Sequence, residues 1–227
     1  NEVLAIKPSI EEKPAKHESR MAGTIEFKDV SFHYPGAEKP ALRNLSFTAR
    51  PGEVTAIIGG TGSGKSTLLK LIPRFYEPSS GSILINGVPA SDYPLEVLRN
   101  KIGLVPQKAV LFTGTVKENI RFGNERATDE EIVHAAKVAQ AFDFISAMND
   151  GFDSLISQGG TNVSGGQKQR LSIARAIVRK PEIYLFDDSF SALDFKTDAN
   201  LRKALKKETG DSTVLIVAQR VSTVKDA

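Results

Sequence analysis

The sequence contains no cysteine and no tryptophan among its 227 residues. Without cysteine the chain forms no disulfide and holds no metal through thiolates, which suits a reducing compartment. No apolar run approaches the roughly 18 residues that a membrane-spanning helix needs, and the N-terminus lacks the charged-then-apolar order of a signal peptide. We therefore expect this stretch of chain to be soluble and to reach a membrane only through a partner or another segment.

A large excess of either charge is also missing. The 30 basic residues are spread among 27 acidic ones, which leaves a net charge of +3 and no dense basic block. Domains that bind nucleic acid usually carry a concentrated basic patch, so we expect no nucleic-acid partner. The apolar fraction of 40% is ordinary for a domain with a real core.

The chain divides into a short leading segment and one domain. Residues 1–23 mix charges with two prolines and show no sustained period, which predicts a linker. The domain is expected over residues 24–227. Within it, residues 24–34 and 42–50 predict two antiparallel strands, and residues 81–87 predict a further short edge strand.

Short, continuous apolar runs predict the core of this domain. Strands that are buried on both faces of a parallel sheet have this pattern, because helices cover each side. The four runs are residues 54–58, 102–105, 183–186 and 214–218. Glycines, acids or glutamines follow each run closely. The carboxyl ends of parallel strands line the ligand crevice of such sheets, so we expect the site at this edge.

A mainly helical subdomain is expected over about residues 110–178. Residues 129–148 carry apolar side chains at helical spacing, with Thr128 as the expected N-cap. Residues 165–180 predict a second helix, which Pro181 ends.

Residues 59–66 match the phosphate-loop pattern G-x-x-x-x-G-K-[ST] at every fixed position, between an apolar strand and a helical segment. Glycines in such a loop let backbone N–H groups point at phosphate oxygens. Lys65 is expected to neutralise β- and γ-phosphate charge and Ser66 to ligate Mg²⁺. The pattern predicts bound ATP or GTP. The expected nucleotide contacts in this loop are Gly59, Thr61, Gly62, Ser63, Gly64, Lys65, Ser66 and Thr67.

The second half of the metal site requires an acid at the end of another buried strand. Asp187 follows the apolar residues 183–186 and is expected to hold Mg²⁺ through water. The alternative is an aspartate that only caps a helix.

Residues 162–170, NVSGGQKQR, resemble the signature sequence of ATP-binding cassette (ABC) proteins, with Val163 where leucine is usual. A serine and two glycines that open a helix bind phosphate by the same physical logic; a plain helix cap is the alternative. The resemblance extends over residues 24–227. It implies an α/β fold with a mostly parallel P-loop NTPase core, an N-terminal antiparallel β subdomain and an inserted helical signature subdomain.

The resemblance also assigns roles to individual residues. It implies that Tyr34 stacks on adenine, which favours ATP over GTP, and that Gln107 touches the metal and the attacking water and senses the membrane domain. Residues 191–194, SALD, match the loop that communicates between paired subunits. A core aromatic, a loop polar residue and an ordinary helix start are the respective alternatives. The signature contacts to ATP are expected from Ser164, Gly165, Gly166 and Gln167.

Residues 106–120, PQKAVLFTGTVKENI, resemble the exporter branch of the family. This resemblance implies a fused transmembrane domain, a position at the cytoplasmic face of the cell membrane, and a second ABC subunit that pairs head to tail with ATP at the interface. The family domain normally continues beyond the last residues of this chain, so we expect a C-terminal truncation.

Two positions depart from the family pattern at the catalytic site. Asp188 and Gln219 stand where the family has its catalytic glutamate and histidine. We expect a site that binds MgATP and hydrolyses it poorly, as in the degenerate subunit of heterodimeric bacterial multidrug exporters. The alternatives are a fully active homodimeric ABC ATPase, a soluble ABC protein of DNA repair or translation, and an ATP-gated binding module that regulates its partner.

Overall fold

The computed structural model describes residues 5–8, 22–60, 62 and 64–219. The chain forms two compact units. Unit 1 combines residues 1–102, 182–187 and 211–227, and unit 2 combines residues 103–181 and 188–210. Within the described ranges, no helix has both the length and the apolar character needed to cross a bilayer.

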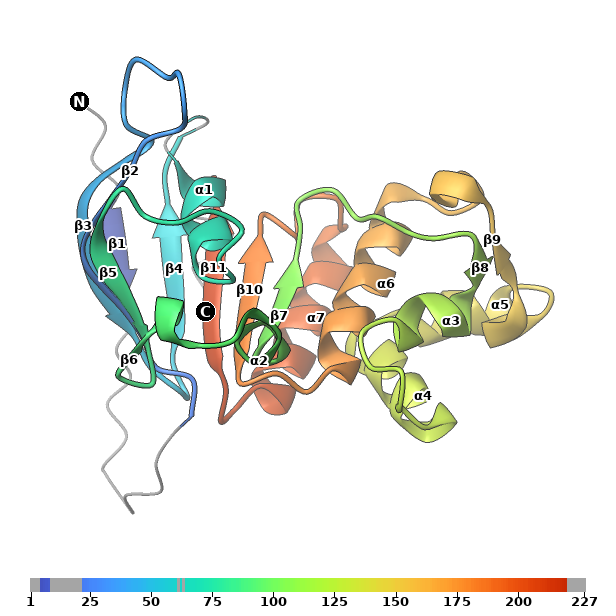
Figure 1. Cartoon of the computed structure of the whole chain (residues 1–227). Helices are drawn as coiled ribbons and strands as arrows, with labels where there is room; N and C mark the ends of the chain where they lie inside the picture. Colours follow the sequence, from blue (N-terminus) through green and yellow to red (C-terminus); the bar gives the residue numbers. More distant parts are fainter. Residues whose placement is uncertain (1–4, 9–21, 61, 63, 220–227) are drawn as a thin grey trace. The chain divides into compact units, whose positions relative to one another are not determined.

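The described residues of unit 1 form two sheets and two short α-helices (Figure 1). Its strands are β1 (Ala5–Pro8), β2 (Ile25–Phe32), β3 (Leu42–Ala49), β4 (Val54–Ile58), β5 (Ser80–Ile85), β6 (Val88–Pro89), β10 (Ile183–Asp187) and β11 (Thr213–Ala218). Its helices are α1 (Lys65–Leu71) and α2 (Leu95–Asn100), and a 3₁₀ turn covers Ala90–Asp92. The strand β7 (Ile102–Val105) begins at the last residue of the first segment of unit 1.

The first sheet has the order β1-β4-β11-β10 in unit 1. β4, β11 and β10 run parallel, and every residue of β11 is buried, as the apolar runs predicted. β1 pairs antiparallel with β4. It lies inside the segment predicted as a linker, where charges and prolines hid a strand of only four residues.

The second sheet is antiparallel, with the order β3-β2-β5-β6. The strand predicted over residues 81–87 is present as β5, but its predicted edge position was wrong, because β6 covers the outer side of β5. Asn86 and Gly87 have φ angles of 54° and 78° between these two strands. A turn with two positive φ angles reverses the chain within two residues, and this reversal brings β6 back onto β5.

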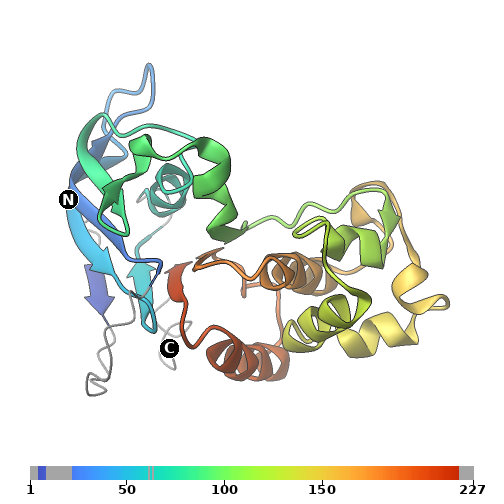
Figure 2. The same ribbon diagram turned by 60° about the horizontal axis from the view of Figure 1, so that its bottom comes forward.

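The helix α1 supplies much of the core of unit 1. Leu68, Leu69, Leu71 and Ile72 are almost completely buried. Figures 1 and 2 show α1 beside the strands of the first sheet, and the helix contacts β10. This packing fixes the residues at the start of α1 against the ends of the strands.

Unit 2 is mainly helical and is built along α6 (Gly165–Val178). Its other helices are α3 (Val116–Arg121), α4 (Asp129–Val138), α5 (Phe142–Ala147) and α7 (Phe195–Glu208), with 3₁₀ turns at Gly151–Asp153 and Gln158–Gly160. The strands β8 (Gly114–Thr115) and β9 (Leu155–Ile156) pair antiparallel. α3 and α4 both pack on α6. The helical stretch predicted over 129–148 is interrupted at Gln140, whose φ is 60°.

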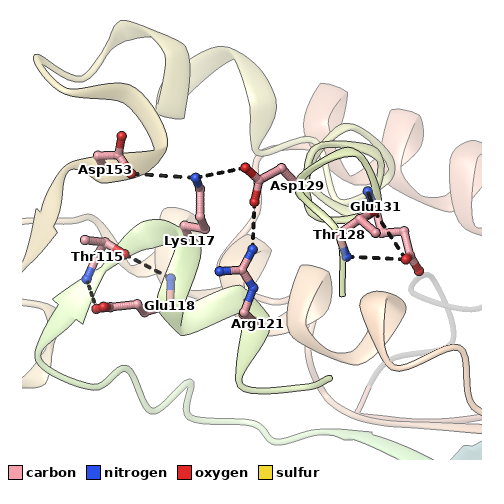
Figure 3. A network of polar contacts seen from close by, with 8 residues as sticks. All are labelled: Thr115, Lys117, Glu118, Arg121, Thr128, Asp129, Glu131 and Asp153. Atoms are coloured by element: carbon pink, nitrogen blue, oxygen red, sulfur yellow. Dashed lines mark hydrogen bonds and ion pairs between the residues drawn. The ribbon is translucent and has the colours of Figure 1, made fainter. Parts of the chain in front are cut away.

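A polar network joins α3 to the N-terminal end of α4 (Figure 3). Thr115 and Thr128 each form a capping box with the glutamate three residues later, which satisfies free N–H groups of the first turn. Asp129 pairs with Lys117 at 3.4 Å and with Arg121 at 2.7 Å. The predicted N-cap at Thr128 is therefore confirmed, and the ion pairs link α4 to α3.

Candidate functional site

Three parallel strands of unit 1 end side by side. Ile58 of β4 pairs with Ala218 of β11, and Val217 of β11 pairs with Asp187 of β10. The residues that directly follow β4 and β11 therefore lie at one edge of the sheet together with Asp187. Gln219, the residue after β11, is exposed. Open parallel sheets bind ligands at this edge.

The glycine-rich loop between β4 and α1 has a tightly defined end. Gly64 is the N-cap of α1 and has a φ of 85°. A Cβ at this position would collide with the carbonyl oxygen of Ala41, so both the backbone conformation and the close approach require glycine. Of the predicted loop contacts, Thr61 and Ser63 lie outside the described residues.

The Lys65 side chain lies beneath this loop and is 7% exposed. Its ammonium group donates hydrogen bonds to the carbonyl oxygens of Gly59 and Gly60, the latter at 2.8 Å. The charge is thereby held directly at the phosphate loop. Phosphate oxygens, as stronger acceptors than neutral carbonyls, can replace these two bonds.

Ser66 and Asp187 meet across 121 residues of sequence. The Ser66 hydroxyl donates to Oδ1 of Asp187 at 3.0 Å. Burial raises the pKa of the Asp187 carboxyl, and the Ser66 hydrogen bond and the charges of Lys70 and Lys65 oppose that rise. A hydroxyl beside a partly buried carboxylate offers the hard oxygen ligands that Mg²⁺ prefers, so these residues fit the predicted metal.

The ring of Tyr34 belongs to an aromatic cluster in unit 1. It stands edge-on to Phe32 and Tyr76, with ring centroids 4.7 and 5.4 Å away. Its hydroxyl is 2.7 Å from Oγ1 of Thr67 in α1. The ring is only half-buried, and it is tied to the helix that follows the phosphate loop.

In unit 2 the signature serine caps α6. The Ser164 hydroxyl oxygen accepts from the N–H of Gln167, and the Gln167 side chain accepts from the N–H of Ser164. The Ser164 hydroxyl proton remains available to donate to an anion. Gly165 has open space around it. A Cβ on Gly166 would lie 3.0 Å from the carbonyl oxygen of Ala192, so the chain after Asp188 passes close to this cap.

Gln107 and Asp188 also belong to unit 2. The Gln107 residue is exposed, and its backbone carbonyl accepts from Nε2 of Gln169 at 2.5 Å. Asp188 has a φ of 46°, in the left-handed region. Its carbonyl accepts from the Ser191 hydroxyl. Asp194 caps α7, and the hydrogen bonds from Thr197 lower the pKa of its carboxyl.

Comparison with known proteins now assigns the family. A family model described as "ABC transporter" matches residues 42–191, which contain the phosphate loop, the Gln107 segment, the signature and Asp187. The chain belongs to the ABC transporter family.

Relatives of this ABC domain include several exporters. The chain is 53% identical over 208 residues to the uncharacterized ABC transporter ATP-binding protein YfiB of Bacillus subtilis, covering 92% of this chain and 36% of that protein. It is 47% identical over 205 residues to a putative multidrug export ATP-binding/permease protein of Staphylococcus aureus, covering 90% and 36%. It is 44% identical over 205 residues to the ATP-dependent lipid A-core flippase of Chromobacterium violaceum, covering 90% and 35%.

A solved structure of a bacterial Atm1-family ABC exporter with ATP bound is similar to this domain, with a TM-score of 0.87 and 38% sequence identity. The match covers 91% of this chain and 36% of that exporter. The predicted fold class is thereby confirmed. The chain spans about a third of the length of the relatives it matches.

The predicted ABC site residues divide between the two units. Unit 1 contains Tyr34, the phosphate loop, Asp187 and Gln219, whereas unit 2 contains Gln107, the signature and Asp188. The structure brings Ser66 and Asp187 into direct contact. The roles assigned to all these residues in nucleotide binding and catalysis stay predictions.

Sequence reasoning missed two residues that interact with the predicted site residues. Lys70 adds a positive charge near Asp187. Its position four residues after Ser66 on the same helix is a signal that helical spacing offers. Gln169 bonds the backbone of Gln107. Only its 4% exposure, which the sequence does not reveal, marks this polar residue as unusual.

Proposed function

We propose that this chain is the ATP-binding and ATP-hydrolysing motor domain of an ABC exporter. The observation that carries the proposal is the bond between Ser66 and Asp187 at the edge where three parallel strands end. Phosphate-loop ATPases hold Mg²⁺ with this pair of residue types. ATP and Mg²⁺ are accordingly the expected ligands.

The chemistry of binding follows from the contacts in unit 1. Phosphate oxygens take over the Lys65 ammonium from the carbonyls of Gly59 and Gly60. Mg²⁺, when bound, screens the charge of the terminal phosphates. In this proposal Ser66 would ligate it directly, Asp187 would bind it through water, and Gln107 would be the third ligand. Tyr34 offers its ring to the adenine.

We further propose that this site turns ATP over slowly. Asp188 is one methylene shorter than glutamate, which pulls the carboxylate back by roughly 1.5 Å. A misplacement of about 1 Å costs a catalytic group on the order of 10²-fold in rate. Gln219 donates a hydrogen bond but neither becomes cationic nor relays a proton as histidine does.

The proposed partner is a second, unlike ABC subunit. The phosphate loop of the partner would pair with the signature of this chain, Ser164 to Gln167, and together they would form an ATP site that hydrolyses ATP. The other ATP site, which contains Asp188, would mainly bind ATP. The names of relatives, a multidrug export ATP-binding/permease protein, a lipid A-core flippase and an Atm1-family exporter, support a fused transmembrane domain and the export of drugs or lipids. A position on the cytoplasmic face of the membrane and export of peptides are parts of the proposal that these names do not address.

The two halves of this proposal are measured on one preparation of the purified chain. Titration with MgATP tests binding, with Lys65→Ala as the control that removes the phosphate-loop charge. Phosphate release at saturating MgATP tests turnover. We expect saturable binding that Lys65→Ala weakens at least about tenfold, and turnover at least about 10²-fold below an ordinary rate of about 1–10 s⁻¹. Absence of binding contradicts the motor assignment, and fast turnover contradicts the slow site.

A fully active homodimer is the second candidate, and the backbone at Asp188 favours it. The residue has a φ of 46°. Aspartate tolerates the left-handed region better than residues with longer side chains. The left-handed backbone is therefore a second explanation for the aspartate at this position, beside the loss of catalytic activity. In this case the purified chain hydrolyses ATP at an ordinary rate, and the rate per subunit rises with protein concentration.

A further inference from the structure

The main chain around Gln107 is held by side chains rather than by secondary structure. β7 ends at Val105, whose carbonyl oxygen accepts from the fully buried Ser189 hydroxyl at 2.9 Å. The carbonyl of Gln107 accepts from Gln169 at 2.5 Å. Further along, the carbonyl of Val110 accepts from Arg175 at 2.8 Å. Three carbonyls within six residues thus each have a side-chain donor.

Two of these three donors come from the signature helix α6. Arg175 also donates to the carbonyl of Asn119, at 2.9 Å, and its guanidinium lies 5.1 Å from the ring centroid of Phe112. Burial lowers the pKa of this guanidinium. Arg175 therefore anchors the far end of the segment to α3 and α6. Gln169 is the donor that reaches the segment at Gln107 itself.

A purely structural role does not explain the Gln169 side chain well. It is 4% exposed, and its Oε1 has no hydrogen-bond partner among the described residues. A buried amide oxygen without a hydrogen-bond partner destabilises a fold, and an apolar side chain of similar shape at this position would remove that cost. The Nε2 group of Gln169 donates to the backbone carbonyl of Gln107.

We propose that Gln169 is a positioning residue for Gln107. Its amide fixes the Gln107 backbone to α6, so the signature helix determines the position of the main chain from which the Gln107 side chain extends. The proposal rests on the proposed function for the role of Gln107. The helix α6 therefore connects Ser164, which caps its N-terminus, to Gln107, which Gln169 binds.

The test is a double-mutant cycle on the affinity for ATP, measured with Mg²⁺ and with EDTA. The ratio of the two dissociation constants reports the metal contact. We expect Gln107→Ala and Gln169→Met each to reduce this ratio about threefold or more. The double variant is expected to reduce it no further than one single variant, because coupled residues are not additive. Thermal stability of Gln169→Met is expected to stay close to that of the wild type.

The matched structural control is Ile173→Val on the same helix. Ile173 is fully buried, and the loss of one buried methyl group destabilises a core modestly. Ile173→Val is expected to lower Tm and to leave the ratio of the dissociation constants with and without Mg²⁺ unchanged. If Gln169 had only a structural role, Gln169→Met would behave in the same way. Where Gln107→Ala does reduce the ratio, an unchanged ratio in Gln169→Met, or strictly additive effects in the double variant, overturns the proposal.

Hydrogen–deuterium exchange separates this proposal from the proposed function. We expect amides 108–111 to exchange at least about threefold faster in Gln169→Met, with α6 unaffected. If Gln107→Ala leaves the Mg²⁺ ratio unchanged, the proposed metal role of Gln107 fails, and the exchange rates alone decide whether Gln169 holds this segment. Unchanged exchange at amides 108–111 overturns the positioning role.

Discussion

Asn119 in α3 is the polar centre of the segment that resembles exporters, and removing its side chain tests how unit 2 is held together. The residue is 2% exposed. Its Oδ1 accepts from the N–H of Phe112 at 2.8 Å and from Arg175 at 3.3 Å. Its Nδ2 donates to the carbonyls of Phe112 and Thr115 at 2.9 and 3.0 Å. One side chain thus satisfies both backbone groups of Phe112, as a neighbouring strand would.

Asn119→Ala breaks these four hydrogen bonds. At about 1 kcal/mol for each net bond, and with some entry of water, the loss is about 3 kcal/mol. For a domain of this size that corresponds to a fall in Tm of about 6–12 °C. Circular dichroism during heating measures the fall.

Asn124→Ala is the matched control for this prediction. Asn124 is less buried, and its two bonds, to the Val178 carbonyl and from the Arg126 N–H, are 3.5 and 3.1 Å long. We expect a loss below about 1 kcal/mol, because long and exposed hydrogen bonds contribute little. A Tm of Asn119→Ala within about 2 °C of the wild type, or equal to that of the control, refutes the reasoning.

Three further predictions address the site and its surroundings. Gly64→Ala should weaken ATP binding at least about tenfold and lower Tm more than Gly62→Ala, because both glycines have positive φ but only Gly64 lacks room for a Cβ; equal Tm values contradict this. Asp187→Asn should raise the Tm of the Mg²⁺-free chain, and increasingly so from pH 4 to pH 8. Burial raises the folded-state pKa of Asp187, so its ionised form loses stability as pH rises through that pKa; a less stable variant at pH 8 contradicts this. Asp129→Asn should lower Tm slightly at pH 7 and by progressively less in acid, because the hydrogen bonds from Arg121 and Lys117 hold the pKa of this exposed carboxyl below its usual value and the stabilisation is lost as pH falls through that lowered pKa; a loss that grows as pH falls contradicts this.

The sequence predicted the parallel core well because its signals are strong and local. Continuous apolar runs located β4, β7, β10 and β11, and the phosphate-loop pattern located the start of α1. The meeting of Ser66 and Asp187 was also expected, since the carboxyl ends of parallel strands share an edge.

The sequence predicted short pairings and backbone conformations poorly. β1 and β6 are strands of four and two residues, too short to show a period. Apolar residues at helical spacing continue through Gln140, but its φ of 60° ends α4. The side-chain amide of Gln140 donates to the carbonyls of Lys137 and Val138. The pattern of apolar residues does not predict this turn.

Part of the candidate site also depends on contacts that no motif encodes. The bond from Gln169 to Gln107 joins residues that are 62 positions apart. A comparison of residue types does not reveal that the backbone of Asp188 is left-handed. This conformation bears directly on why aspartate stands there, because glutamate tolerates it less well.

The most direct test of the proposed slow site is phosphate release at saturating MgATP by the wild-type chain and by the Asp188→Glu, Gln219→His double variant, each over a range of protein concentrations. The account predicts a nearly silent wild type and a variant whose activity rises faster than linearly with concentration, as a head-to-tail dimer requires. Wild-type turnover of about 1 s⁻¹ or more would contradict it, and Asp188 would then be a competent catalytic residue in its own left-handed backbone.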